Sequence, residues 1–230
     1  IFHLRRLQAG PALQALRRAD QLQRRIAPQD AGIAALIRGN IADALRREGR
    51  PAEALQWLQE TLADPLMEPF RIGEVSVALF QAAEAGALHD LGRHAEALPL
   101  ARQAVATSSR FLGSNNYLTL VHKSGVASIQ HALGHCTLAL QLAREVRDGM
   151  AREFGEEMQA TLIEIGNLGL REVTCGDRAA GLAYLEQAEN SLRLRFGEDN
   201  LAAAGFRHVL TQSLAEGGPP QALPKSAGAI

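Results

Sequence analysis

Small residues and leucines recur at fixed distances from a series of glycines, and this pattern predicts paired helices. A small residue stands seven positions before each glycine and another stands five positions after it, followed by a leucine. Successive glycines are 42 or 43 residues apart. Two antiparallel helices approach closely only where small side chains face each other, so each glycine is expected to be the turn of a helical hairpin. The residues concerned are the turn glycines Gly49, Gly92, Gly134 and Gly176, the small residues before them, Ala42, Ala85, Ala127 and Gly169, the small residues after them, Ala54, Ala97, Ala139 and Gly181, and the leucines Leu55, Leu98, Leu140 and Leu182.

A second set of glycines, also 42 residues apart, marks the other end of each hairpin. These are Gly113, Gly155 and Gly197, which follow the aromatic residues Phe111, Phe154 and Phe196. Glycine just after the last helical turn is a common way to end a helix, so the set predicts helix C-termini. Prolines stand at expected turns or first helical turns, and no segment alternates as a strand would. A fixed period of this length is typical of an all-α solenoid, in which each unit buries its apolar face against its neighbours.

The period divides the chain into repeats. We expect a single solenoid over residues 1–223 and a flexible tail at 224–230. The expected units are a partial repeat at 1–27, full repeats at 30–70, 73–113, 115–155 and 157–197, and a partial repeat at 200–223. Gly10 is expected to turn a first helix into a second one that runs to Ile26, and Asp30 is expected to cap the next helix. The DPLMEPF segment replaces the glycine loop after the first full repeat and is expected to be the least regular junction.

With these marks the chain resembles the tetratricopeptide repeat family, in the 42-residue variety seen in kinesin light chains. The matching features are the small residue in the first helix, the Leu-Gly-Arg or Glu-Gly-Arg turn, the Ala-Glu-Ala-Leu opening of the second helix, and the glycine loops FLGSNN, FGEEM and FGEDN. The Asp-His-Pro step that usually follows the loop glycine in that variety is absent. The resemblance implies a right-handed α-solenoid of antiparallel helix pairs, whose first helices line a concave groove that receives peptides or protein segments.

The same resemblance implies which residues face a partner, at nine, six and three positions before each turn glycine and at close neighbours. Carried over to this sequence, the candidate partner-binding residues are Asn40, Asp43, Arg46, Arg47, His89, Ser128, His131, Asn167, Arg207 and His208. An asparagine amide can donate to and accept from the backbone of an extended peptide at once. The arginines would favour acidic or carboxylate-bearing segments. The alternative is that all of these are polar residues on exposed helix faces with no ligand.

Composition limits the partners. The 24 basic and 25 acidic side chains leave a formal charge of −1, so we expect no general attraction to nucleic acid or to an anionic membrane. No apolar run is long enough to span a bilayer. The two cysteines, Cys136 and Cys175, lie in different repeats, so we expect neither a disulfide framework nor a zinc ribbon. A reducing cytoplasm is the simpler setting for such a chain.

A catalytic function would have to depend on the histidines. His131 and His135 are four apart, as in some metal sites, but Gly134 is expected to end the helix between them. Because no nucleophile, phosphate-loop or dinucleotide motif is present, we expect no enzyme activity, no metal and no cofactor. The leading hypothesis is a non-catalytic protein- or peptide-binding module, a scaffold or sensor part of a larger regulatory protein. The alternative is a homodimerisation module that pairs through the incomplete C-terminal repeat.

Overall fold

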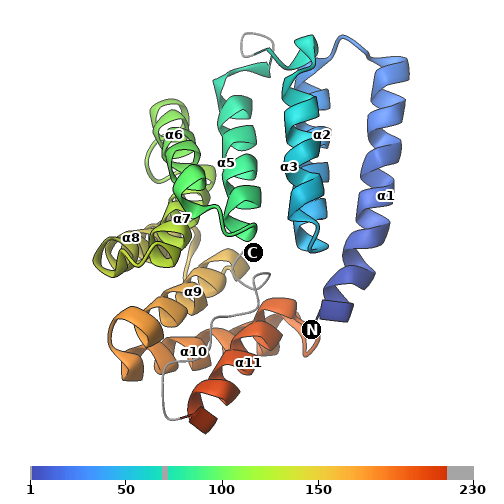
Figure 1. Cartoon of the computed structure of the whole chain (residues 1–230). Coiled ribbons are helices and arrows are strands. Elements are labelled where there is room, and N and C mark those ends of the chain that lie inside the picture. The colour runs from blue at the N-terminus through green and yellow to red at the C-terminus, as the bar shows by residue number, and fades with distance from the viewer. Residues whose placement is uncertain (1, 69–71, 217–230) are drawn as a thin grey trace. The chain divides into compact units, whose positions relative to one another are not determined.

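The protein is helical throughout the part that the computed structural model describes, residues 2–68 and 72–216 (Figure 1). Within these ranges there are ten α-helices, one short 3-10 helix and no strand, which confirms the all-α prediction. The elements are α1 (Phe2–Ile26), α2 (Ala31–Arg47), α3 (Pro51–Leu62), η1 (Pro65–Met67), α5 (Glu74–Asp90), α6 (His94–Leu112), α7 (Tyr117–Ala132), α8 (Cys136–Phe154), α9 (Gln159–Cys175), α10 (Arg178–Phe196) and α11 (Leu201–Glu216). They form two compact units, an N-terminal unit of α1–α6 and a C-terminal unit of α7–α11.

In the N-terminal unit, α2 pairs with α3 and α5 pairs with α6, while α1 packs on α2. A core of alanines with Leu58, Met67, Ile72 and Phe80 lies between these helices. Trp57 packs against this core, and its indole N–H donates to the carbonyl of Arg38 at 3.0 Å. The single tryptophan is therefore a packing residue, because both its ring and its polar atom are used inside the unit.

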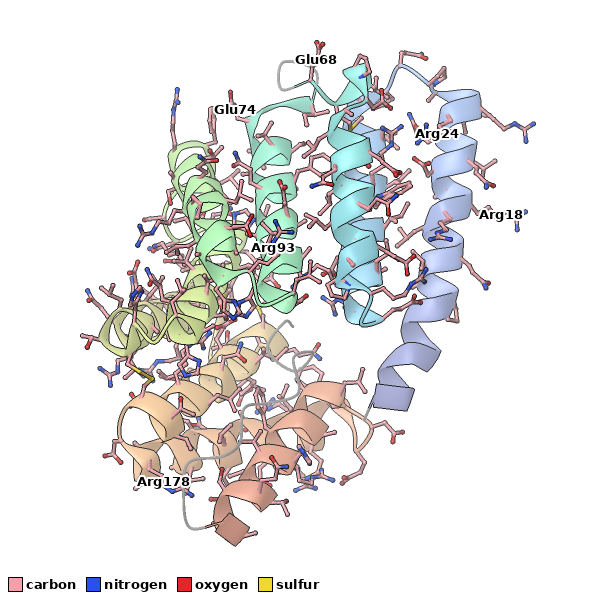
Figure 2. The ribbon with its side chains drawn as sticks, viewed as in Figure 1. Arg18, Arg24, Glu68, Glu74, Arg93 and Arg178 are labelled. Atoms are coloured by element: carbon pink, nitrogen blue, oxygen red, sulfur yellow. A yellow bond between two sulfur atoms is a disulfide. The ribbon has the colours of Figure 1, made fainter. Side chains whose placement is uncertain are left out.

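The helix α1 joins α2 through a buried ion pair as well as through apolar contact. The Arg38 Nε of α2 bonds to Oδ1 of Asp20 at 3.1 Å, and Arg24 bonds to the other oxygen of the same carboxylate at 2.8 Å. Leu13 is buried on α1. Arg18 is exposed and extends from the side of α1 that faces away from α2 (Figure 2). One face of α1 thus presents charged side chains to solvent, and the opposite face packs against α2.

In the C-terminal unit, α7 pairs with α8, α9 pairs with α10, and α11 packs on α10. A core cluster joins α9, α10 and α11 and includes Leu185, Leu192, Phe206 and Val209. Phe206 lies against Gly166, where an added Cβ would clash with the ring. The apolar side chains of α11 are thus mostly covered by its own unit, although Leu214 is 73% exposed.

The small residues lie where the paired helices cross, as the pattern predicts. Ala54, Ala97 and Ala139 are completely buried. In the fourth pair the backbones come closer still, because a Cβ at Gly181 would lie 2.6 Å from the backbone nitrogen of Val173 and 2.8 Å from the carbonyl oxygen of Gly169. Real side chains essentially never approach so closely, so this crossing requires glycine whereas the others accept alanine.

Three of the four hairpin turns share one hydrogen-bond pattern. The residue after the turn glycine donates its N–H to a carbonyl five positions earlier, as from Arg50 to Leu45, and the glycine has a φ near +75°, at 75° in Gly49. Gly176 differs, with a φ of −136°. The N–H of Asp177 instead donates to Oε2 of Glu172 at 3.1 Å, so a side chain replaces the backbone acceptor.

The turn expected at Gly10 is wrong, since α1 runs without a break from Phe2 to Ile26. The residue after Gly10 is Pro11, which has no N–H and cannot make the bond that Arg50 makes in the regular turns. The partial repeat expected at the start of the chain is therefore one long helix rather than the end of a hairpin.

The predicted helix ends are confirmed elsewhere. Gly113, Gly155 and Gly197 follow helix C-termini with φ values of 93°, 89° and 95°. The Asp30 side chain caps α2 by accepting the N–H of Ile33 at 3.0 Å. The irregular junction contains η1, while residues 69–71 lie outside the described part of the chain, as do the expected final short helix and the tail within 217–230.

Candidate binding face of the first helices

Residues at thirteen, nine, six and three positions before a turn glycine lie on one face of each first helix, because these spacings follow the helical period. We call this the first-helix face. In the N-terminal unit the faces of α2 and α5 are directly adjacent. The Arg46 guanidinium lies over Gly86, where it occupies the space that a Cβ would take. The Arg46 Nε also bonds to Oδ2 of Asp90 at 2.9 Å, which fixes the register of the two helices.

The open part of this face is apolar with one amide, and we call it the α2 patch: Ile33, Leu36 and Asn40 of α2 with Leu79 of α5. Ile33 is 49% exposed, Leu36 is 61% exposed and Leu79 is 37% exposed. The register set by Arg46 puts Leu79 at the level of Leu36 along the two helices. Asn40 is exposed, and no hydrogen bond of its side chain is seen within the described ranges.

The sequence analysis missed the apolar row of this face. An apolar residue stands thirteen positions before every turn glycine, at Leu36, Leu79, Val121, Ile163 and, before Gly217, Ala204. This recurrence is visible in the sequence, whereas the family resemblance implies only the polar positions closer to the turn, where a ligand's backbone would be held.

The charged residues beside the α2 patch are already paired with one another. The Arg47 Nε bonds to Oδ2 of Asp43 at 2.7 Å, and Arg46 is held by Asp90. Burial raises the pKa of Asp90, although Arg46 opposes the shift. His89 contacts His94 through their Nδ1 atoms at 3.0 Å. Because Arg46 and Arg47 are paired with carboxylates, the surface beside the α2 patch is less positive than the number of arginines implies.

In the C-terminal unit the corresponding residues bond to each other across α7 and α9, and we call this set the α7–α9 ladder. Ser124 donates to both carboxylate oxygens of Glu164 at 2.9 and 2.8 Å. Arg171 donates to Ser128 Oγ at 2.7 Å and to the carbonyl of Asn167 at 2.8 Å. The ladder residues are these five with His131 and Thr174, whose Nε2 and Oγ1 atoms lie 2.7 Å apart.

Burial shapes the charges of this ladder. Burial raises the pKa of Glu164, while Arg171 and hydrogen bonds from Ser124 and Asn167 oppose the shift. Burial also lowers the pKa of Arg171 and that of His131. Asn167 is only 7% exposed and bonds within the protein, so it differs from Asn40, which stands at the same position of its repeat.

The remaining predicted binding residues lie on α11. Arg207 bonds to Oε1 of Glu189 through Nε at 2.8 Å and through Nη2 at 2.6 Å. His208 is half-buried. Of the ten predicted residues, Asn40 is exposed with no side-chain hydrogen bond seen in the described ranges, whereas Arg46, Ser128, His131 and Arg207 bond to a neighbouring helix.

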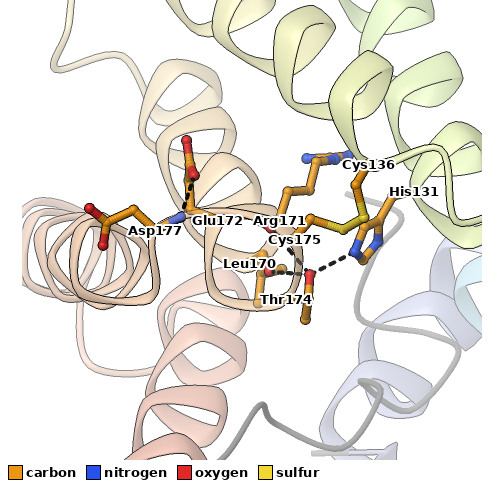
Figure 3. Close-up of a disulfide and its surroundings, with 8 residues drawn as sticks. All are labelled: His131, Cys136, Leu170, Arg171, Glu172, Thr174, Cys175 and Asp177. Atoms are coloured by element: carbon orange, nitrogen blue, oxygen red, sulfur yellow. Dashed lines mark hydrogen bonds between the residues drawn. A yellow bond between two sulfur atoms is a disulfide. The ribbon is translucent and has the colours of Figure 1, made fainter.

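The expectation of unpaired cysteines is wrong, because Cys136 and Cys175 form a disulfide with a Cα–Cα distance of 5.4 Å (Figure 3). Cys136 opens α8 and Cys175 ends α9. Their separation of 39 residues is close to one repeat, and residues one repeat apart lie side by side in a solenoid. The pairing removes the argument for a reducing compartment that unpaired cysteines would have supported.

The histidine pair does not share a helix. α7 ends at Ala132 and α8 begins at Cys136, with Gly134 between them at a φ of 79°, which confirms the predicted break. His131 bonds to Thr174, and His135 Nδ1 lies 2.6 Å from Gln130 Oε1. No group of three potential metal ligands occurs among residues 2–68 and 72–216. Within the same ranges, no helix has both the length and the apolar character needed to cross a bilayer.

The sequence profile of the tetratricopeptide repeat matches residues 35–64, over most of α2 and α3, and residues 85–116, over the end of α5 and all of α6. In these two segments the chain carries repeats of the tetratricopeptide type. This confirms the resemblance that the glycine and alanine spacing indicated. A search of the curated proteins found no match for this chain.

Solved structures show the same architecture. BtubC (BKLC) from P. vanneervenii matches with a TM-score of 0.66 and 18% sequence identity, over 96% of this chain and 88% of that one. A Podosopora anserina kinesin light chain protein with nearly identical TPR-like repeats matches with a TM-score of 0.57 and 21% identity, over 84% of this chain and 90% of that one. At such identities the likeness shows the fold alone, an all-α solenoid.

Proposed function

We propose that the chain is a non-catalytic interaction module that holds an extended segment of a partner protein on its first-helix face, as the scaffold or sensor part of a larger regulatory protein. Repeats of this family generally mediate protein–protein interaction. The observation that carries the proposal is the α2 patch, where two exposed apolar side chains of α2 lie on the same helix face as Asn40. The opposite face of α2 is buried in the core, so this patch is the part of the helix left for a partner.

The chemistry of the patch favours a segment with at least one apolar side chain. Such a side chain would cover Leu36 and Leu79, while the Asn40 amide would bond to the backbone beside it. The acidic preference expected from the arginines stays a prediction. Ion pairs of Arg46 with Asp90 and of Arg47 with Asp43 argue that it is weak.

The test is selection of peptides from a random displayed library on the purified chain, followed by affinity measurement on variants. Leu36→Glu should weaken the selected peptides by about tenfold or more, because covering a leucine contributes about 1.5–3 kcal/mol. Asn40→Ala should weaken them less. The matched control is Leu62→Glu, which places the same charge on an apolar residue of α3 that is 43% exposed.

Helical content of all three variants should match that of the original chain, since each substitution is at an exposed position. If Leu62→Glu abolishes binding while Leu36→Glu retains it, the partner is held by second helices and the proposal fails.

A further inference from the structure

The disulfide lies at the junction of the third and fourth helix pairs, where α9 turns into α10. We propose that Cys136 and Cys175 are a reversible redox site, opened by a small thiol of the glutathione class and closed by the corresponding disulfide, and that its state controls the rigidity of the turn from Thr174 to Arg178. The proposal is independent of the binding function argued above.

The position of the two cysteines gives a reductant access. Cys136 and Cys175 are both half-buried, at a helix start and a helix end, so neither is sealed in the core. Exposed disulfides are the ones that small thiols reduce, whereas buried structural bonds resist exchange.

Other contacts hold the same junction without the covalent bond (Figure 3). His131 bonds to Thr174, the residue before Cys175, as Figure 3 shows. Arg171 also bonds to Ser128. Below them, an apolar cluster of Ala127, Leu140, Ala143 and Leu168 joins α7, α8 and α9. Cys175 packs against this cluster, but neither the two hydrogen bonds nor the contacts among the cluster residues need the S–S bond. They therefore remain after reduction and keep the two thiols close together. Reoxidation then needs no refolding, which is the condition for a reversible site.

The turn next to Cys175 is the part that depends most on the bond. It lacks the backbone hydrogen bond that closes the other three turns, and the N–H of Asp177 relies on the Glu172 carboxylate instead. Arg144 of α8 also donates to Glu172, through Nη2 at 2.5 Å. A turn held by side chains opens more easily than one closed by backbone bonds, so the disulfide is the strongest restraint on it.

The exchange balances as a two-electron reduction. A thiolate of the reductant attacks one cysteine sulfur, the S–S bond breaks, and the other cysteine leaves as a thiolate that takes up a proton. A second reductant thiolate attacks the mixed disulfide and releases the first cysteine, which is protonated in turn. The protein gains two thiols, and two reductant thiols become one disulfide.

The test equilibrates the whole chain in buffers of reduced and oxidised glutathione without denaturant. The fraction of free thiols should be counted by mass after alkylation, and amide exchange should be followed by mass spectrometry. We expect full, reversible interconversion, unchanged helical circular dichroism, and at least tenfold faster exchange at Gly176 and Asp177 in the reduced form. Leu120, on the N-terminal part of α7, should exchange at the same rate in both forms.

Cys136→Ser provides a second route to the open state. It should show the fast exchange at Asp177 in both reducing and oxidising buffer, which separates loss of the bond from any effect of the thiol reagent. If this variant fails to fold, the chain reduced by glutathione still gives the measurement. The proposal is overturned if reduction requires denaturant, if the reduced chain loses its helical signal, or if exchange at the turn is equal in the two forms.

Discussion

Replacement of Gly181 by alanine tests the close approach of α9 and α10. The added Cβ would lie 2.6 Å from the backbone nitrogen of Val173 and 2.8 Å from the carbonyl of Gly169. Both are backbone atoms, so no side chain can rotate away to make room, and α9 and α10 must move apart. Overpacking of this kind costs about 1–3 kcal/mol.

The higher helix propensity of alanine partly offsets this loss of stability, so a control variant is needed. Alanine is favoured over glycine within a helix by about 1 kcal/mol, so the net loss of stability at Gly181 should be about 0–2 kcal/mol. Gly125, within α7 of the same unit, is the matched control, because nothing lies within 4 Å of a Cβ built there. Gly125→Ala should therefore raise the free energy of unfolding by up to about 1 kcal/mol.

The measurement is urea unfolding of both variants followed by circular dichroism at about 222 nm, in the helical band. The midpoint of Gly181→Ala should fall below that of the original chain, and the midpoint of Gly125→Ala should rise. Equal or higher stability of Gly181→Ala relative to Gly125→Ala would refute the assignment of glycine to a backbone contact at this crossing.

Three further outcomes are expected. Arg38→Met should lower the free energy of unfolding by about 3–5 kcal/mol, measured as a lower thermal midpoint. Arg38 is 1% exposed and bonds to Asp20 and Asp64, so the buried Asp20 carboxylate would lose part of its compensation. Burial lowers the pKa of His131 below its usual 6.5. The neutral imidazole therefore contributes stability above about pH 6.5, and this contribution is lost as the pH falls. Between about pH 7.5 and pH 5, the unfolding midpoint should drop less for His131→Gln than for the original chain. If the chain forms dimers through its last helix, Leu214→Glu should reduce the dimer fraction in sedimentation equilibrium, whereas a monomer at high concentration would remove that hypothesis.

The sequence by itself determined the positions of the helical turns and of the helix crossings. Turn glycines such as Gly92 need a positive φ, and small residues such as Ala97 are needed wherever two helices cross, so both leave a periodic mark that can be read without coordinates. The same reasoning failed at Gly10, where the periodic mark is present but Pro11 removes the donor that closes the turn. Pro11 is visible in the sequence, and its lack of an N–H argues against a turn closed like the one at Arg50.

Tertiary structure alone decided which of the equivalent residues face solvent. Asn40 and Asn167 occupy the same position of their repeats, yet Asn40 is exposed and Asn167 is 7% exposed. Asn167 lies in the α7–α9 ladder, where Ser124 and Ser128 of α7 bond to the neighbouring helix α9. The disulfide was hidden for a related reason. Pairing depends on the distance between Cys136 and Cys175 in space, which follows from how two successive hairpins stack, and a separation of 39 residues along the chain carries that information only once the stacking is known.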